Sequence, residues 1–417
     1  MKKTISGLLA LLLLLTLCVG CGGKDGQTDS EDQQSKKEDA AGENMPVNSI
    51  FTTLTDLDMS ETVLEVEGNA IPADLYLYWL MNKSYELEYQ LNMFKLSYGM
   101  YGETLDEDGH IKWDQTLEGT PLADIVRQNA ENNAMSYALL ENVAKAHNIA
   151  LTEEDQAAVD EALAQQIEQS GGEEAFDQSL YETGLSRDSH TRMIASQYLY
   201  QHLVELANDP ASDLYEAPSD DNAYVDHILL MTKDSTTNEP LSEEEIAAKK
   251  AQAEDLLAQL QASDDLEALF TELAGAYGED PGRESGAGYL IDPDTNFVQE
   301  FKDAAFALKP GELSGIVESD YGYHILLRKE LTGEHLRTLA ENHLCEYLDA
   351  QMEAAMGTMV RSEKLDSLDV GALYTAYIEK LQALHPAEEQ EPEDTGSEED
   401  GLTGSIEAAY PGTEPAE

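Results

Sequence analysis

The side chains with the clearest chemical potential are two histidines, one aspartate and two phenylalanines in the second half of the sequence. His227 and His324 each lie in an apolar run, Asp280 precedes Pro-Gly, and Phe297 and Phe301 are four residues apart. Two imidazoles held together can set each other's tautomers, and aromatic rings can form an apolar pocket. The other histidines are scattered without HExxH spacing, so the sequence predicts no catalytic metal site.

These residues belong to five segments that follow one another in a distinctive order and spacing. The segments are residues 227–230, 277–280, 297–301, 306–314 and 322–326. Together they resemble a parvulin-type (PpiC-type) peptidyl-prolyl cis/trans isomerase domain over residues 220–331. Each segment alone is a weak signal, whereas all five in order are a strong one.

The resemblance implies a reaction that needs neither a cofactor nor a bond to the enzyme. Rotating an amide costs about 18–20 kcal/mol because its conjugation must be broken. Bonds that precede proline keep a sizeable cis population, and their uncatalysed exchange is slow. A site that holds the proline ring in an apolar pocket and favours the twisted amide would suffice.

The resemblance also implies catalytic and substrate-binding roles for individual residues. The catalytic positions are Asp280, which faces the amide, and His227 and His324, which form the pocket floor. The substrate-binding positions are Phe297 and Phe301, which grip the proline ring, and Ser319 and Tyr321, which lie beside the histidines.

Each assignment has a simpler alternative. Phe301 could belong to the core beside Phe306, Asp280 could be only a turn former, and the histidine pair could be structural rather than a path for protons. Residues 287–291 read Ala-Gly-Tyr-Leu-Ile where the family has Gly-Gly-Asp-Leu-Gly, which leaves the pocket rim and the catalytic strength open. The basic cluster of phosphate-directed parvulins is missing, so phosphoserine selectivity is not expected.

Short strands and helices position these segments. The pattern predicts a strand at residues 224–230, a helix from a Ser242–Glu245 capping box to about 260, and a helix over 266–277. A short helix at 300–308 and a strand at 323–328 complete a compact α+β unit. The flanking segments are helical instead, over 121–146, from Thr152, from Ser186, over 331–352 and over 370–384. The expected fold class is therefore α+β, a parvulin-type domain inserted in a mostly α-helical chaperone domain.

The flanks extend the resemblance to PrsA-type foldase lipoproteins with a SurA-like helical chaperone module. The similar parts are the strand, turn and helix over residues 63–80 and the Gly-Leu-Ser-Arg-Asp at 184–188. This implies one helical chaperone domain in two parts, residues 47–215 and 332–385. Residues 82–120 fit the family pattern poorly and are interpreted as an insertion, whose role the sequence leaves open.

The N-terminus has the pattern of an export signal. Two lysines precede residues 6–20, which carry no charge, and the stretch ends in Cys-Val-Gly-Cys. This resembles a bacterial lipoprotein signal over residues 1–20, with Cys21 as the lipidated residue; an ordinary signal or an uncleaved anchor helix is the alternative. Residues 21–46 are predicted to be a disordered tether, and residues 386–417 a disordered acidic tail. The expected location is the extracellular face of the membrane of a single-membrane bacterium.

Composition restricts the partners. The 417 residues carry 24 Lys+Arg against 84 Asp+Glu, a formal net charge of -60. Nucleic acids and anionic lipids are repelled by such a surface, so nucleic-acid binding is excluded and membrane attachment must be covalent or hydrophobic. Away from the signal the only cysteine is Cys345, which we expect to be buried and inert.

The predicted function is that of an isomerase and chaperone for unfolded exported polypeptides that contain X-Pro bonds. The main alternative is a holdase whose parvulin domain only binds. A solute-binding lipoprotein is a more distant alternative, because it needs two lobes of alternating strands and helices. The sequence leaves open the clients and the oligomeric state, including a homodimer.

Overall fold

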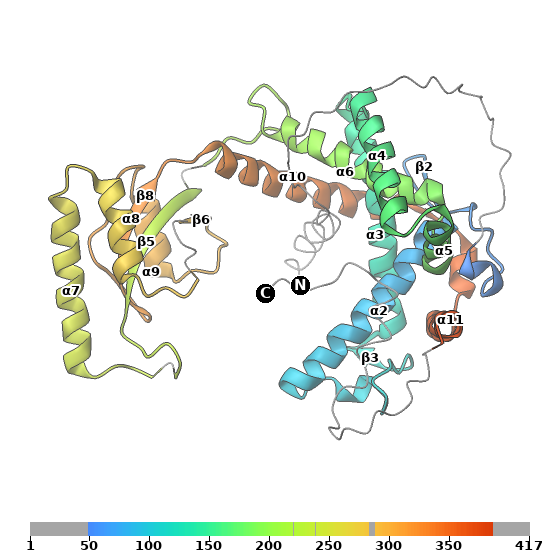
Figure 1. Ribbon diagram of the computed structural model, residues 1–417, viewed down its shortest axis with the longest axis horizontal. Coiled ribbons are helices and arrows are strands. Elements are labelled where there is room, and N and C mark those ends of the chain that lie inside the picture. The colour runs from blue at the N-terminus through green and yellow to red at the C-terminus, as the bar shows by residue number, and fades with distance from the viewer. Residues whose placement is uncertain (1–48, 220, 238, 283–287, 387–417) are drawn as a thin grey trace. The chain divides into compact units, whose positions relative to one another are not determined.

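The computed structural model describes residues 49–386, except 220, 238 and 283–287 (Figure 1). The predicted signal, the Cys21 lipidation site, the tether and the acidic tail lie outside the described residues. Contacts divide the chain into two compact units. One unit contains the described residues up to Leu203 and from Cys345 onward, and the other contains Val204–Leu344.

The Val204–Leu344 unit is built on an antiparallel sheet in the order β6-β5-β8-β7. Its central strands are β5 (Ala223–Met231) and β8 (Gly322–Lys329), and its edges are β6 (Tyr289–Ile291) and β7 (Val317–Ser319). The helices are α7 (Glu243–Gln261), α8 (Leu266–Tyr277) and α9 (Gln299–Ala307). Each predicted helix and strand of this unit is confirmed to within two residues. The Ser242–Glu245 capping box is also confirmed, since each side chain bonds the other residue's backbone N–H.

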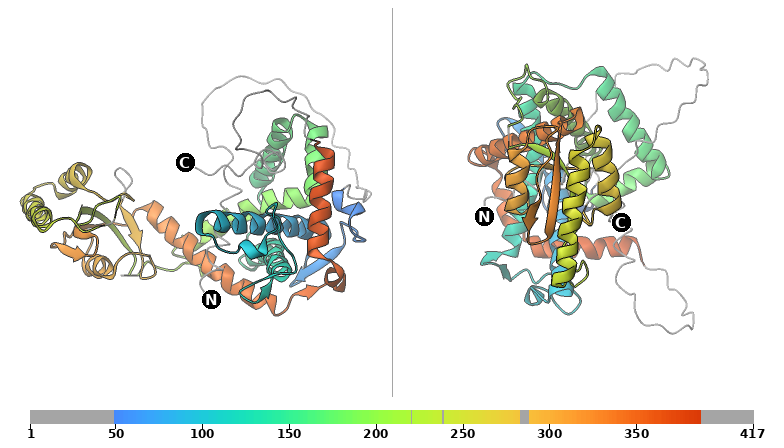
Figure 2. Two further views of the ribbon diagram at one scale, coloured as in Figure 1. Left: turned by 90° about the horizontal axis from the view of Figure 1, so that it is seen from below. Right: turned by 90° about the vertical axis from the view of Figure 1, so that its left-hand side faces the viewer.

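Helices cover both faces of the sheet (Figure 2). Each face carries an apolar core. On one face Ile228, Leu230 and Ile325 pack against α7 and α8. On the other face Val225 and Leu326 pack against α9 through Phe301. Since successive strand residues point to opposite faces, His227 and His324 belong to the α9 face.

The other unit is mostly helical. Its helices are α2 (Ala73–Tyr98), α3 (Leu122–Ala146), α4 (Glu153–Gln169), α5 (Glu173–Thr183) and α11 (Val370–Leu384). Two further helices, α6 (Arg187–Ala207) and α10 (Gly333–Met356), cross the boundaries between the units. The predicted helix starts are confirmed, and Thr152 forms a full capping box with Asp155 at α4. Cys345 is buried as expected, 6% exposed.

A small sheet joins the two parts of the helical unit. Its order is β2-β1-β9, with β1 (Thr62–Val66) paired to β2 (Asn69–Pro72) and to β9 (Val360–Arg361). Arg361 also donates to Glu131 of α3 at 2.7 Å. The segments before and after the α+β unit therefore form one fold, which confirms the predicted fold class.

Residues 82–120 continue α2 and then turn back along it. The 3₁₀ turn at Gly102–Thr104 is followed by the hairpin of β3 (Thr116–Leu117) and β4 (Thr120–Pro121). Among the described residues, no helix is both long and apolar enough to cross a membrane.

Candidate active site

The centre of the site is the pair of histidines on β5 and β8. His227 lies opposite Leu326 and Leu229 lies opposite His324 in the antiparallel register, so the two imidazoles are diagonal neighbours on one face. Their Nδ1 atoms are 3.3 Å apart. Both side chains are buried, and their rings are stacked at an interplanar angle of 16°.

Asp280 and Ser319 close the two ends of this pair. His227 Nε2 lies 2.8 Å from Asp280 Oδ2, and His324 Nε2 lies 2.7 Å from Ser319 Oγ. The hydrogen bond from His227 is the main reason why the pKa of Asp280 lies well below its usual range. Asp280 is therefore an ionised acceptor at neutral pH.

The ionised carboxylate fixes the direction of one hydrogen bond in this series. A carboxylate only accepts, so His227 Nε2–H donates to Asp280. The two Nδ1 atoms share one hydrogen bond, and Ser319 Oγ bonds His324 Nε2 at the far end. Burial, together with the neighbouring His227, lowers the pKa of His324 to about 4, so this ring is neutral near pH 7.

Asp280 serves both as a turn former and as a site residue. Its Oδ1 accepts from Gly282 N at 3.1 Å within the turn after α8, while its Oδ2 faces His227. The preceding residue, Glu279, donates its N–H to Leu229 O at 2.9 Å and ties this segment to β5. The carboxylate is therefore held in place from both sides.

Tyr289 is a member of the site that the sequence reasoning did not assign. Its hydroxyl donates to Asp280 Oδ2 at 2.6 Å, and its ring contacts His227 and Phe297 at centroid distances of 5.6 and 5.0 Å. Tyr289 lies in the segment that departs from the family pattern, at the position where the family has aspartate. That departure was the available signal, because a tyrosine can donate to a carboxylate while an aspartate cannot.

The two phenylalanines occupy different depths. Phe301 is 0% exposed and meets both imidazoles edge to face, at centroid distances of 5.1 and 5.6 Å. Phe297 stacks on Phe301 at 4.9 Å and is only partly buried. Phe301 therefore does not form an exposed wall of a pocket. Phe301 supports the histidine pair from the core, and Phe297 carries the accessible aromatic face.

Ser319 and Tyr321 lie at the turn between β7 and β8. Tyr321 N donates to Ser319 Oγ at 3.2 Å, so Tyr321 joins the network through its backbone, and its side chain is half exposed. The turn needs Gly322, whose φ is +148° and where a Cβ would lie 2.1 Å from Leu230 O.

The segment at residues 306–314 is structural. Ser314 N donates to Leu326 O, and Ser314 Oγ accepts from Leu326 N, both at 2.8 Å. Arg328 donates to Leu308 O at the end of α9. These bonds fasten α9, and with it Phe301, against β8.

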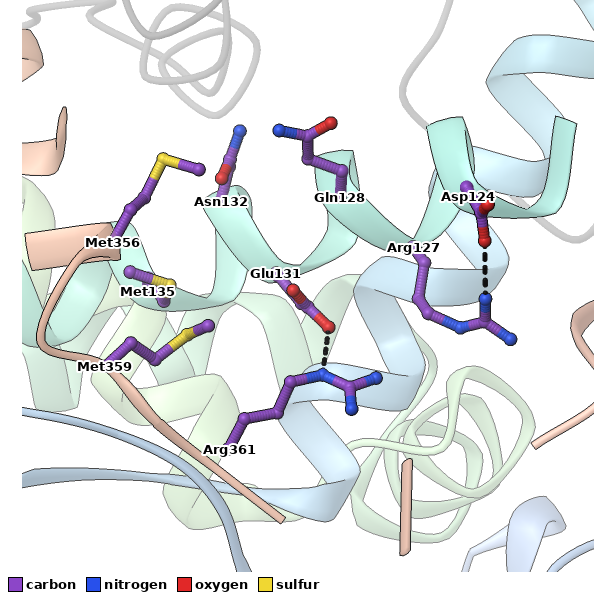
Figure 3. Close-up of a pocket in the computed structure, with 9 residues that line it drawn as sticks. All are labelled: Asp124, Arg127, Gln128, Glu131, Asn132, Met135, Met356, Met359 and Arg361. Atoms are coloured by element: carbon purple, nitrogen blue, oxygen red, sulfur yellow. Dashed lines mark hydrogen bonds and ion pairs between the residues drawn. The ribbon is translucent and has the colours of Figure 1, made fainter. Parts of the chain in front are cut away.

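A separate cavity of about 300 Å³ lies in the helical unit, between α3 and the end of α10 (Figure 3). Three thioethers cluster on one side of it, from Met135, Met356 and Met359. Gln128 and Asn132 extend their amides from the neighbouring turns of α3. The rest of the lining is charged, with Arg127 bonded to Asp124 and Arg361 bonded to Glu131.

Comparison with known proteins assigns the α+β unit. Residues 214–330 match the family model described as the PPIC-type PPIASE domain. This segment is a PpiC-type peptidyl-prolyl isomerase domain. The parvulin-type domain predicted from the sequence is confirmed by this match.

The chain is also similar to proteins named foldase. Foldase protein PrsA of Staphylococcus aureus strain Newman is 27% identical over 171 residues, which are 40% of this chain and 50% of the relative. The chain thus spans about half the length of the curated relatives it matches. The crystal structure of PrsA from Bacillus subtilis is 18% identical, with a TM-score of 0.24, and the match covers 60% of this chain and 87% of that one. NmPin, the parvulin of Nitrosopumilus maritimus, is 26% identical with a TM-score of 0.19, and covers 27% of this chain and 100% of its own.

Proposed function

We propose that the chain is an exported foldase that isomerises X-Pro bonds in unfolded polypeptides and holds these polypeptides on its helical unit. The hydrogen-bonded series Ser319–His324–His227–Asp280 is the observation that best supports catalysis. Similarity to proteins named foldase supports the assignment to unfolded clients.

Asp280 acts on the amide by electrostatics rather than by transferring a proton. In a planar amide, conjugation places negative charge on the oxygen, and twisting the bond removes part of this charge. A carboxylate beside the oxygen repels the planar form more than the twisted form, which lowers the barrier. Phe297 offers the proline ring an apolar face in this arrangement.

The histidines keep Asp280 in its ionised state and fixed position. With its pKa near 4, His324 is neutral at pH 7, which makes it a poor proton donor there. The hydrogen-bonded network thus holds the Asp280 carboxylate in place and in its ionised form. Ser319 completes it with a hydrogen bond to His324 Nε2.

Export and lipid attachment belong to the same proposal. The signal pattern over residues 1–20 supports cleavage before Cys21, and a lipid on Cys21 would hold the foldase at the extracellular face of the membrane. There the acidic surface would keep crowded clients soluble.

A proline-isomerisation assay on a series of short X-Pro peptides tests the enzyme assignment. We expect the full chain to accelerate exchange and Asp280→Ala to lose most of this activity, beyond any loss of folded protein that thermal melting shows. Asp264→Ala, at an exposed aspartate outside the network, is the matched control. If the wild-type chain is inactive yet suppresses aggregation of an unfolded client, it is a holdase with a degenerate PpiC-type domain.

A further inference from the structure

Tyr224 of β5 bonds the segment that carries Tyr289 into the site. The hydroxyl of Tyr224 accepts a hydrogen bond from Gly288 N at 3.0 Å. Gly288 directly precedes Tyr289, the first residue of β6, and the Tyr289 hydroxyl donates to Asp280 Oδ2 at 2.6 Å. Tyr224 is therefore linked to the Asp280 carboxylate through one intervening tyrosine.

Tyr224 and Tyr289 belong to opposite faces of the sheet. Tyr289 is paired with Val225 across β5 and β6, and both residues pack in the core of the α9 face, where His227 also lies. Successive residues of a strand point to opposite faces, so the side chain of Tyr224 leaves β5 on the face of α7 and α8. Because β6 is an edge strand, the Tyr224 hydroxyl can reach Gly288 at the margin of the sheet. The contact is thus with the main chain that leads into Tyr289.

The main chain at Gly288 lies very close to β5. A Cβ added to Gly288 would lie 2.5 Å from Val225 O and 3.1 Å from Cε2 of the Tyr224 ring. Only glycine allows the backbone to approach its neighbours this closely. The segment before Tyr289 is therefore packed directly against β5 and Tyr224, so that a shift of Tyr224 displaces Tyr289.

The ring of Tyr224 is itself held by residues around the start of α10. Its centroid lies 3.8 Å from the centroid of the His335 ring, and the two planes are tilted by 35°. His335 Nδ1 accepts from Thr332 N at 3.0 Å, which fixes the imidazole in the first turn of the helix. Lys329 Nζ lies 5.9 Å from the centroid of the Tyr224 ring and adds a cation–π contact. These contacts hold the Tyr224 hydroxyl at one position.

We propose that Tyr224 is a positioning residue of the isomerase, which fixes the main chain before Tyr289 and so places the hydroxyl that Tyr289 donates to Asp280. This inference rests on the proposed isomerase function and deepens it at the same site. Asp280 Oδ2 faces two donors, the Tyr289 hydroxyl at 2.6 Å and His227 Nε2 at 2.8 Å. Each hydrogen bond to the charged form stabilises the carboxylate, provided that its donor is within bonding distance. The position of the main chain at residue 288 therefore decides whether the second donor is in place.

Kinetics of Tyr224→Phe in the full chain test the proposal, because this change removes the hydroxyl and keeps the ring that stacks on His335. We expect kcat for a short X-Pro peptide to fall by about three- to tenfold, as for the loss of one hydrogen bond. KM should stay nearly constant, because the aromatic face of Phe297 remains. Tyr277→Phe, at a half-exposed tyrosine of the same unit, should leave both constants unchanged. Urea denaturation checks that both variants remain folded.

A double-mutant cycle separates positioning from a general loss of stability. If Tyr224 acts through Tyr289, then Tyr224→Phe should lower kcat in the wild-type background and cause little further loss in the Tyr289→Phe background. The acid limb of the pH–rate profile should move to higher pH in both single variants, because each weakens a hydrogen bond to Asp280. Losses of kcat that multiply in the double variant would overturn the proposal, as would an acid limb that Tyr224→Phe leaves in place.

Magnetic resonance of the histidine rings reports on the same connection without an isomerase assay. The chain has nine histidines, so isotope labelling of histidine alone gives few signals, and His227→Gln identifies those of His227. The His227 Nε2 signal should shift in the same direction in Tyr224→Phe and Tyr289→Phe, and stay in place in Tyr277→Phe, because Nε2 is bonded to the Asp280 carboxylate. An inactive wild type would refute the enzyme function alone. An unshifted His227 signal in Tyr224→Phe would overturn the role of Tyr224.

Discussion

His227 and His324 meet through their Nδ1 atoms, 3.3 Å apart, across a pair of antiparallel strands. The contact depends on register, since a slip of one residue would move one imidazole to the opposite face of the sheet. Asp280 and Ser319 bond the two outer nitrogens, so each of the four ring nitrogens has a partner. Variants can test each of these connections.

Tyr289→Phe removes the hydroxyl that donates to Asp280. We expect the pKa of Asp280 to rise toward its ordinary value, and the free energy of unfolding to fall by about 1 kcal/mol. Isomerase activity should begin to fall at a higher pH on acidification than in wild type. The pH–rate profile and urea denaturation measure these effects. Tyr277→Phe, at a half-exposed tyrosine of the same unit, is the control, and an identical profile for both variants would contradict a role for Tyr289.

Phe301→Ala and Phe297→Ala should separate support from substrate contact. Phe301 is fully buried, so its truncation should cost about 3–5 kcal/mol of stability. Phe297 is partly exposed, so its truncation should cost less stability but lower isomerisation beyond any loss from unfolding. Chemical denaturation measures the stability of both variants, and peptide isomerisation measures the activity of the same samples. Full activity in Phe297→Ala would remove it from the proline pocket.

Stability should fall as the pH is lowered from about 6.5 to about 4. An unfolded histidine binds a proton near pH 6.5, whereas burial lowers the pKa of His324 in the folded chain to about 4. Between these values the unfolded state binds more protons, so acid favours unfolding. The depressed pKa of Asp280 acts in the same direction at lower pH, because its stabilising effect is lost only when the carboxylate is protonated.

Urea denaturation at pH 7 and pH 5 measures this effect for the wild type and for His324→Gln. The pKa values of His190 and His335 are also lowered by burial, so part of the pH dependence should remain in the variant. The difference between the two proteins isolates His324. Equal pH dependence in both would show that His324 does not contribute.

Cys21→Ser tests the attachment to the membrane. Without a thiol to acylate, the protein should appear in the medium, because each buried CH₂ of an acyl chain contributes only about 0.8 kcal/mol and two chains are needed for stable anchoring. Cell fractionation followed by immunoblotting measures this. Retention of the variant in the membrane fraction would indicate an uncleaved anchor helix instead.

The sequence by itself determined the features that depend on neighbouring residues. The capping boxes at Thr152 and Ser242 begin helices where the pattern predicts them, because capping needs only the next three residues. Apolar periodicity likewise predicted α8, and the five spaced segments identified the domain. The candidate site residues came from the family resemblance that these segments carry, and their roles stay predictions until the variants are measured.

Only the tertiary structure decided the features that join distant parts of the chain. The pairing of β9 with β1, the hydrogen bond from Tyr289 to Asp280 and the full burial of Phe301 each depend on how separate segments pack. Burial of single residues shows the same limit, since Leu96 and Tyr98 of α2 are apolar and yet 80% and 72% exposed. Local spacing records that a face is apolar, while packing alone decides whether the protein covers it.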